Sequence, residues 1–467
     1  RERIDLLRSE GGARGYFGGE AFNIIFDQAG MVGYDPDDPI VMGRIGDTGV
    51  SICKAEDFEI LFEGTDLTRT NVSLVCNNAS PAMLALYIAA AERMKCPKEK
   101  LRGNIMNYLY CYFFMDSEYF KPQNAFKVMK EVVKYCTENT PLWNTVTLTE
   151  HNIAEAGANA VQSLAFILSM SIGLTEECIK AGLNPDAFLP RFGFHVRTGD
   201  NFFEDIGKIR ALRRMWAKIN RERFGCTNPR ALQARIHAQT AGANMTVQQP
   251  LNNLVRTTIG ALAMILAGVN GTQIDAYDEA LGEPTEEAVT LSLRAQQIIE
   301  HETGIIDISD PLGGSYYLEW LTSEIEKKAY ELIGKIDRMG GYIKRVESGW
   351  FHEQVTALAY RWRQEVEGGE RVVVGVNKYQ SDREEQIRVF QPDPEVERAA
   401  IEDVRRHRRE RDNAKTQAAL DSLKAEAMRV AQSDAEGELM EAMVKAAADD
   451  ATLGEIMGML REIFGTN

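Results

Sequence analysis

The chain has 467 residues, 44% hydrophobic and 26% charged, which is enough to bury one large core or two ordinary ones. A formal net charge of -16 excludes a typical nucleic-acid binder, which needs a basic surface to displace counterions from phosphates. No apolar run reaches the roughly 18 residues of a membrane span, and the first residues lack the apolar core of a signal peptide. Seven scattered cysteines without CxxC spacing predict reduced, buried thiols, so we expect a cytoplasmic protein without membrane or nucleic-acid partners.

After an N-terminal segment (residues 1–20), short β-rich runs alternate with amphipathic helices. Strands are predicted over residues 22–27, 71–77, 102–108, 144–150, 188–196, 232–240, 271–276 and 304–309. Helices are predicted over residues 80–94, 124–139, 159–174 and 202–225. Parallel strands with helical crossovers close into a barrel at about eight repeats. We therefore predict an α/β fold of the (β/α)8 TIM-barrel type, with an open doubly wound sheet as the alternative.

The last third of the sequence differs from this alternation. Residues 311–370 are predicted to be helices, and a short strand follows at 371–376, within a barrel domain that covers residues 21–390. Pro392 and Pro394 mark a boundary before a helical extension, residues 391–467, that begins with one long charged helix. Apolar residues in "ELMEAMVKAAADDATLGEIMGMLREIF" predict an amphipathic surface that docks another subunit.

Polar side chains gather where the predicted strands end, which is where a parallel barrel carries its active site. They are Asp27, Gln28, Glu150, His151, Asn152, His237, Gln239, Asp275, Asp278 and Glu279. The runs "TVTLT" and "QARIHAQT" alternate apolar residues with small or polar ones, whereas a filled barrel carries Val, Ile and Leu on its inner positions. We therefore predict a hollow, polar-lined barrel with room for a ligand along its axis.

Each polar residue also has an ordinary structural interpretation. Glu155 could cap a helix, His237 could be a hydrogen-bonded core histidine, and residues 275–279 could form a solvated loop. Convergence of so many polar groups on strand ends favours a site instead. No metal is predicted, because neither His-x-His nor HExxH spacing occurs, and GxGxxG and GxSxG motifs are absent as well.

Collinear segments between about residues 22 and 380 carry a resemblance to a known family. They include "FDQAGMVGYDPDDP", "EAGANAVQ", "PRFGF", "HAQTAG", "YDEALGEPT" and "DPLGGSYYLE". In these segments the chain resembles the large, substrate-binding subunit of the methylmalonyl-CoA mutase family, the adenosylcobalamin-dependent acyl-CoA mutases. The resemblance implies a hollow barrel threaded by the pantetheine chain of CoA, an acyl-CoA substrate, and a cobalamin that caps the carboxyl ends of the strands.

The resemblance also implies roles for individual residues. Gln239 and Glu279 match positions that contact the ribose of the 5'-deoxyadenosyl group, and Glu155 matches a carboxylate near the cobalamin. We group His237 with these cofactor-binding residues. The positions that hold the CoA chain and the thioester are matched by Ser73, Asn144 and Arg191.

The acyl pocket departs from the family pattern after the fourth strand. The family motif Gly-Tyr-His is here Glu150-His151-Asn152, so histidine replaces the tyrosine and asparagine replaces the catalytic histidine. His151 is therefore the expected acid, with Asn152 and His195 as further catalytic candidates. On the third strand, Met106 begins the segment that matches the family's Gln-Asn-Asp.

Other departures concern the charge of the substrate. The arginine that pairs with the free carboxylate of methylmalonyl-CoA falls at Asp116, which would repel that carboxylate, so methylmalonyl-CoA is not expected. Arg197 could supply a carboxylate anchor of different geometry. Ile25 is apolar where a hydroxyacyl-specific relative would carry an aspartate, which speaks against a 2-hydroxyisobutyryl group.

Two family features do not occur in these residues: the Asp-x-His-x-x-Gly segment, whose histidine is the lower cobalt ligand, and the N-terminal extension that wraps CoA. We therefore expect a small cobalamin-binding subunit as partner in a homo- or hetero-oligomer. The predicted function is that of an isomerase, the large subunit of a mutase for a substituted succinyl-CoA or a branched acyl-CoA. The alternative is a catalytically retired barrel that acts as a binding or assembly partner.

Overall fold

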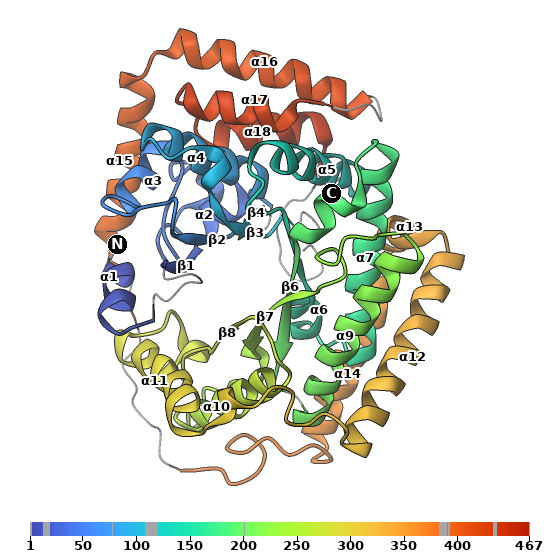
Figure 1. Cartoon of the computed structure of the whole chain (residues 1–467). Coiled ribbons are helices and arrows are strands. Elements are labelled where there is room, and N and C mark those ends of the chain that lie inside the picture. Colours follow the sequence, from blue (N-terminus) through green and yellow to red (C-terminus); the bar gives the residue numbers. More distant parts are fainter. Residues whose placement is uncertain are drawn as a thin grey trace. The chain divides into compact units, whose positions relative to one another are not determined.

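The computed structural model describes residues 2–12, 19–76, 78–107, 120–199, 201–382, 390, 393–432 and 437–466. The chain divides into two compact units. Unit 1 comprises Arg1–Thr147, Leu174–Phe192 and Pro392–Asn467, and unit 2 comprises Leu148–Gly173 and Gly193–Gln391. Figure 1 traces the helices and strands in chain order.

Unit 1 contains a parallel sheet in the order β1-β2-β3-β4. Its strands are β1 (Ala21–Ile25), β2 (Asn71–Val75), β3 (Arg102–Ile105) and β4 (Trp143–Asn144). One face of the sheet is buried through Phe22, Ile24, Val72 and Leu74. The other face carries alternate residues that remain partly exposed, as a period of two along each strand requires.

The apolar helix α4 (Ser80–Arg93) is buried within unit 1 from Ser80 to Ala91, and α3 (Ala55–Leu61) and α5 (Pro122–Asn139) pack on it. The other helices of unit 1 before the C-terminal segment are α1 (Glu2–Ser9), α2 (Gln28–Val32) and α8 (Pro185–Phe188), with 3-10 turns η2 (Pro39–Val41), η3 (Lys98–Lys100) and η5 (Leu189–Arg191).

The predicted single helix at the start of the C-terminal extension is wrong, because the structure has two. They are α15 (Pro394–Glu410) and α16 (Asn413–Gln432). Helix α15 ends at Arg411, whose backbone is extended, and the Asp412 side chain then accepts hydrogen bonds from the first backbone N–H groups of α16.

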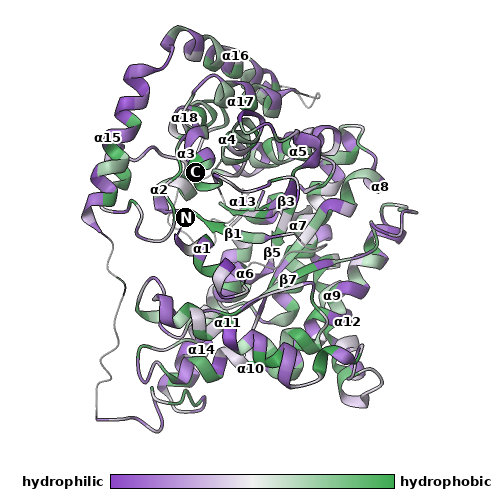
Figure 2. Ribbon diagram, turned by 60° about the vertical axis from the view of Figure 1, so that its left-hand side comes forward, coloured by the Kyte–Doolittle hydropathy of each residue, from purple (hydrophilic) through white to green (hydrophobic). Residues whose placement is uncertain are grey.

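The extension continues with α17 (Leu439–Ala448) and α18 (Leu453–Phe464). Both pack on α4, and α16 lies against α17 and α18 (Figures 1 and 2). The apolar residues predicted to dock another subunit, among them Leu439, Met443, Ile456 and Leu460, are therefore buried within unit 1.

The second parallel sheet, in the order β5-β6-β7-β8, belongs almost entirely to unit 2. Its strands are β5 (Val146–Thr149), β6 (Phe192–Thr198), β7 (Arg235–Thr240) and β8 (Gly271–Gln273). The helices that follow are α6 (Glu150–Glu155), α7 (Ala160–Lys180), α9 (Phe202–Glu222), α10 (Asn252–Leu266), α11 (Glu286–Glu302), α12 (Tyr316–Arg338), α13 (Gly341–Glu347) and α14 (Trp350–Glu367), with 3-10 turns η6 (Gly242–Asn244), η7 (Glu279–Leu281) and η8 (Ile305–Asp307).

In the parts of the chain that the structure describes, eight parallel strands alternate with helices, but two predicted strands are wrong. Residues 304–309 form the turn η8, in which Gly304 adopts a left-handed φ of 67° and Ile306 and Ile308 stay exposed. Residues 371–376 make only an isolated bridge between Val374 and Lys378. The predicted strand 144–150 is divided into β4 and β5, so the number of strands still equals the predicted eight although residues 304–309 form none.

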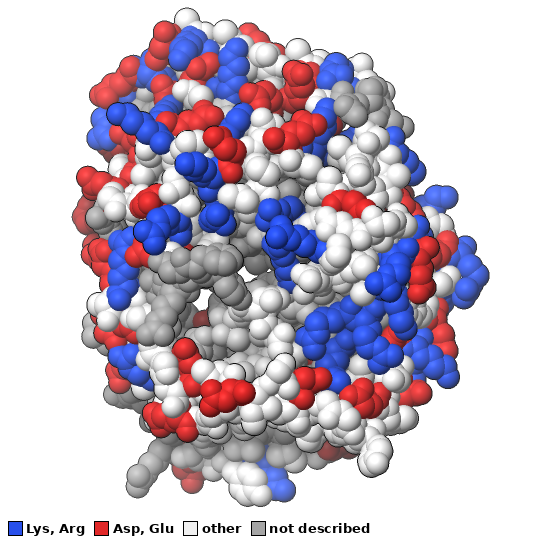
Figure 3. Space-filling view, in the orientation of Figure 1, with Lys and Arg blue, Asp and Glu red and all other residues white. Residues whose placement is uncertain are grey.

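Basic side chains gather over α9 in Figure 3. Arg214 and Lys218 lie 3.0 and 2.6 Å from the carboxylate of Glu326 on α12, and Arg210 lies 2.7 Å from Glu319. This basic group is thus paired within unit 2. None of the helices in the described parts of the chain combines the length and hydropathy that crossing a bilayer requires.

Candidate active site at the strand ends of unit 2

Three imidazoles lie side by side on the sheet of unit 2. Strands β6 and β7 place His195 opposite His237, and His151 lies on α6 directly after β5. The rings of His151 and His195 stack with centroids 4.8 Å apart and planes within 7°, and the centroids of His195 and His237 are 5.4 Å apart. Burial lowers the pKa of all three imidazoles, that of His237 to about 4, so they are uncharged at neutral pH.

Several ring nitrogens in this cluster lack a hydrogen-bond partner among the described residues. The Nε2 atoms of His151 and His237 are buried and make no hydrogen bond to any residue that the structure describes. The His151 ring donates instead to the backbone carbonyl of Thr240, which leaves Nε2 as the nitrogen without a proton. Buried polar atoms without a partner are uncommon, and here they indicate room for a polar ligand group.

Arg197, on β6, is surrounded by protein acceptors and is only 5% exposed. Its Nε lies 2.8 Å from Glu155 Oε1, Nη1 donates to the carbonyl of Ala154, and Nη2 donates to Asn244 Oδ1 at 3.3 Å. The second carboxylate oxygen of Glu155 accepts the backbone N–H of Ala243 at 2.6 Å. Arg197 and Glu155 therefore tie α6 to the turn η6.

Glu150 and Lys208 form an ion pair of 3.0 Å at 1% and 5% side-chain exposure. Glu150 Oε2 accepts the backbone N–H of Arg197 at 2.9 Å, and Lys208 Nζ donates to the Arg197 carbonyl at 2.8 Å. The pair thus fixes the backbone of Arg197 from both sides. Sequence analysis missed Lys208, although a glutamate in place of the family's glycine indicates that a buried cation is needed.

Carboxylates and an amide occupy the ends of β7 and β8. Gln239, paired with Arg197 in the β6–β7 register, donates through Nε2 to Asp275 Oδ1 at 2.6 Å. Burial and the charge of Glu279 raise the pKa of Asp275 to about 8. Glu279 is exposed to solvent, and its carboxylate makes no hydrogen bond to a described residue. Partial desolvation and the charges of Asp278 and Glu155 raise its pKa. Sequence analysis noted Asp275 but gave it no role.

The predicted CoA-binding residues lie in unit 1. Ser73 and Asn144 belong to one row of paired residues, Asn23–Ser73–Asn104–Asn144, on the partly exposed face of the sheet. Ile25, 43% exposed, lies on the same face. Sequence analysis missed Asn23 and Asn104, although their alternate placement in "FNII" and "RGNI" indicated this face.

The remaining candidates have mixed positions. Arg191 ends the turn η5 and donates to the Leu142 carbonyl at 3.4 Å. Met106 is 8% exposed, and its carbonyl accepts the Ser80 hydroxyl at 2.7 Å. Asn152 lies on α6 beside His151, and Asp116 lies outside the described residues.

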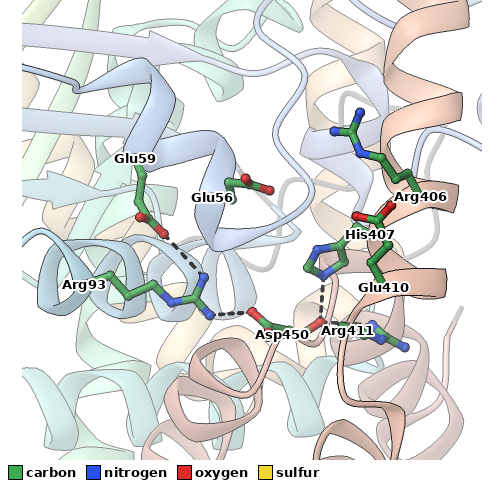
Figure 4. Close-up of a pocket in the computed structure, with 8 residues that line it drawn as sticks. All are labelled: Glu56, Glu59, Arg93, Arg406, His407, Glu410, Arg411 and Asp450. Carbon is green, nitrogen blue, oxygen red and sulfur yellow. Dashed lines mark hydrogen bonds and ion pairs between the residues drawn. The ribbon is translucent and has the colours of Figure 1, made fainter.

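A separate polar pocket of about 360 Å³ lies within unit 1 (Figure 4). Its lining residues are Glu56, Glu59, Arg93, Arg406, His407, Glu410, Arg411 and Asp450. Arg93 joins Glu59 to Asp450, and both His407 and Arg411 contact the Asp450 carbonyl. These side chains hold the end of α17, so the pocket is explained by packing of the extension.

Parallel strands that carry buried imidazoles and are followed by buried carboxylates are typical of a (β/α)8-type enzyme. Comparison with known proteins identifies the family. Residues 16–466 match the methylmalonyl-CoA mutase family, and the chain belongs to it. Its members are isomerases that depend on coenzyme B12, and their TIM-barrel fold confirms the predicted fold class.

Individual relatives cover nearly the whole chain. It is 37% identical over 94% of its length to the 2-hydroxyisobutanoyl-CoA mutase large subunit of Aquincola tertiaricarbonis, of which the alignment covers 78%. It is 36% identical over 96% of its length to the methylmalonyl-CoA mutase of Rhizobium meliloti, and 35% identical to the human mitochondrial enzyme over the same share. It spans 62% and 59% of those two proteins.

Proposed function

We propose that this chain is the large, substrate-binding subunit of an adenosylcobalamin-dependent mutase that rearranges the carbon skeleton of an acyl-CoA other than methylmalonyl-CoA. The observation that carries the proposal is the grouping of Glu155, Gln239 and Glu279 at the strand ends of unit 2. The charges of Glu155 and Glu279 interact, and both raise the pKa of Asp275. Gln239 donates a hydrogen bond to Asp275. These three residues match the family positions for the adenosyl side of the cavity.

The chemistry of these residues fits an adenosyl group. Ribose hydroxyls are hydrogen-bond donors, and Glu279 offers a carboxylate that makes no hydrogen bond to a described residue. Glu155 and Gln239 are held in place by Arg197 and Asp275, which preorganises two further acceptors. When bound, adenosylcobalamin supplies a carbon radical by homolysis of its carbon–cobalt bond. The part of this chain is to hold the ribose and to exclude water.

His151 and Asn152 are proposed to face the acyl group. Both follow β5 directly, one turn before Glu155 on the same short helix, so one strand end can serve the acyl side and the cofactor side of a single cavity. Ser73, Asn144 and Arg191 are proposed to hold the CoA chain and thioester. The partly exposed polar row of unit 1 supports the first two of these assignments.

A small subunit that carries the cobalt-ligating histidine is the proposed partner. One observation supports it: a relative over 94% of the chain is itself named a large subunit. The purified chain is expected to bind cobalamin weakly and to lack turnover, and addition of a small subunit with an Asp-x-His-x-x-Gly segment is expected to create both. Absorbance titration with cobalamin measures the first effect, and tight stoichiometric binding by the chain alone would contradict the split arrangement.

Glu279→Ala tests the adenosyl assignment in the assembled enzyme. We expect weaker binding of adenosylcobalamin but unchanged binding of hydroxocobalamin, because only the former carries the ribose that Glu279 contacts. Glu287→Ala, an exposed glutamate on α11, is the matched control. If the Glu279 variant binds adenosylcobalamin as tightly as the unmodified protein does, Glu279 does not belong to the proposed site.

A further inference from the structure

The cationic side chains at the strand ends of unit 2 are paired with other groups of the protein. Within the described residues of this cluster, the cations are Arg197 and Lys208. All three guanidinium nitrogens of Arg197 contact the protein, at Glu155, Ala154 and Asn244. Lys208 is bound to Glu150 and to the Arg197 carbonyl, at 5% side-chain exposure.

The other titratable groups at the strand ends of unit 2 disfavour binding of an anion there. Burial and the charges of Glu279 and Glu155 raise the pKa of Asp275, and burial with the charges of Asp278 and Glu155 raises the pKa of Glu279. The three imidazoles are buried and uncharged, so they add no positive charge. A further carboxylate would meet like charges in a desolvated environment, where their repulsion is only weakly screened.

We propose that the acyl group accepted by this site is uncharged, a branched monocarboxylic acyl chain rather than a substituted succinyl or malonyl group. The inference rests on the proposed function and narrows its substrate class. A substrate carboxylate would have to displace Glu155 from Arg197 or stay buried without a counter-ion, and either is costly. An uncharged acyl group leaves the Arg197–Glu155 pair intact. The interpretation of Arg197 as a carboxylate anchor is thereby replaced by one in which it braces the site.

Two thioesters of nearly equal shape test this directly. Isobutyryl-CoA and methylmalonyl-CoA differ by a methyl group in place of a carboxylate. Titration calorimetry with the full chain is expected to show isobutyryl-CoA binding at least about tenfold more tightly, as exclusion of one unpaired charge implies. Equal or tighter binding of methylmalonyl-CoA would overturn the inference. Failure of either thioester, and of CoA itself, to bind would instead contradict the proposed function.

Glu155→Gln separates the role of the ion pair from that of pocket shape. This change removes one negative charge and releases Arg197, so the preference for isobutyryl-CoA is expected to shrink severalfold while circular dichroism stays unchanged. Glu367→Gln, which disrupts an exposed pair with Arg363 on α14, is the matched control and is expected to keep the preference. An unaltered preference in the Glu155 variant would show that the pair does not set it.

Discussion

At the scale of single residues, burial decides what His151 can do. Its depressed pKa leaves it neutral, and its ring N–H is used by the Thr240 carbonyl, so Nε2 is available as an acceptor. We therefore propose a hydrogen-bonding and positioning role for His151 rather than the acid role expected from the sequence. Asn152, next in the chain, can supply an amide donor.

His151→Ala in the assembled enzyme is expected to lower kcat by about 10- to 100-fold, as loss of one oriented polar contact in the acyl pocket implies. Cobalamin affinity should not change, because the residue is proposed to face the acyl group. His352→Ala, an exposed histidine on α14, is the control. Steady-state kinetics with absorbance titration distinguish the outcomes, and near-normal kcat would leave His151 as a wall residue.

His237 links the site to acid stability. Its pKa is about 6.5 in an unfolded chain and about 4 when folded, so the unfolded state binds the proton first. The contribution of His237 to the free energy of unfolding is fully present above pH 6.5 and is lost as the pH drops towards 4. The largest loss from this group is roughly 3 kcal/mol. His237→Asn is expected to flatten the decline between these pH values in denaturant titrations. An equally steep decline in the variant would assign the acid sensitivity to other groups.

At the scale of elements, α15 braces the loop that follows β1 and α2. Arg408 contacts Asp35 and Asp37 at 2.5 and 2.9 Å, and Glu397 accepts the backbone N–H of Gly43 at 2.8 Å. Asp35, 4% exposed, also accepts hydrogen bonds from the start of α18. The extension thus holds a loop whose sequence, "GYDPDDP", belongs to the segments shared with the family.

Arg408→Ala is expected to destabilise unit 1 by roughly 2 kcal/mol, because Asp35 would lose its counter-ion while buried; the partial exposure of Arg408 keeps the cost below that of a fully buried pair. Arg409→Ala, which breaks an exposed pair with Glu402 on the same helix, should have almost no effect. Thermal unfolding of both variants provides the measurement. Equal midpoints would show that the brace contributes no stability.

At the scale of the whole molecule, the C-terminal extension completes a core rather than adding an appendage. Because α17 and α18 bury the apolar surface of α4, a chain that ends at residue 393 would expose that surface to water. We expect this truncation to aggregate or unfold in unit 1, as measured by size-exclusion chromatography and circular dichroism. A stable, monodisperse truncated chain that merely fails to assemble would instead restore the docking interpretation.

The sequence by itself determined the β/α order, the family and the strand ends that carry polar groups. These are local properties: hydrophobic periodicity identifies a strand or a helix within a few residues, and collinear motifs identify relatives. The failures were local too, since "GIIDIS" has the composition of a strand but forms a 3-10 turn, and Asp412 caps the start of a second helix where the charge pattern predicts one continuous helix.

Only the tertiary structure decided which charges meet and which apolar faces are covered. Glu150 and Lys208 are 58 residues apart, and no spacing predicts that they hold the backbone of Arg197 from both sides. The apolar face of α17 has the same sequence pattern whether it packs on α4 or on another protein. Periodicity records that a face is apolar, whereas the fold alone determines what covers it, because that contact joins residues distant in the chain.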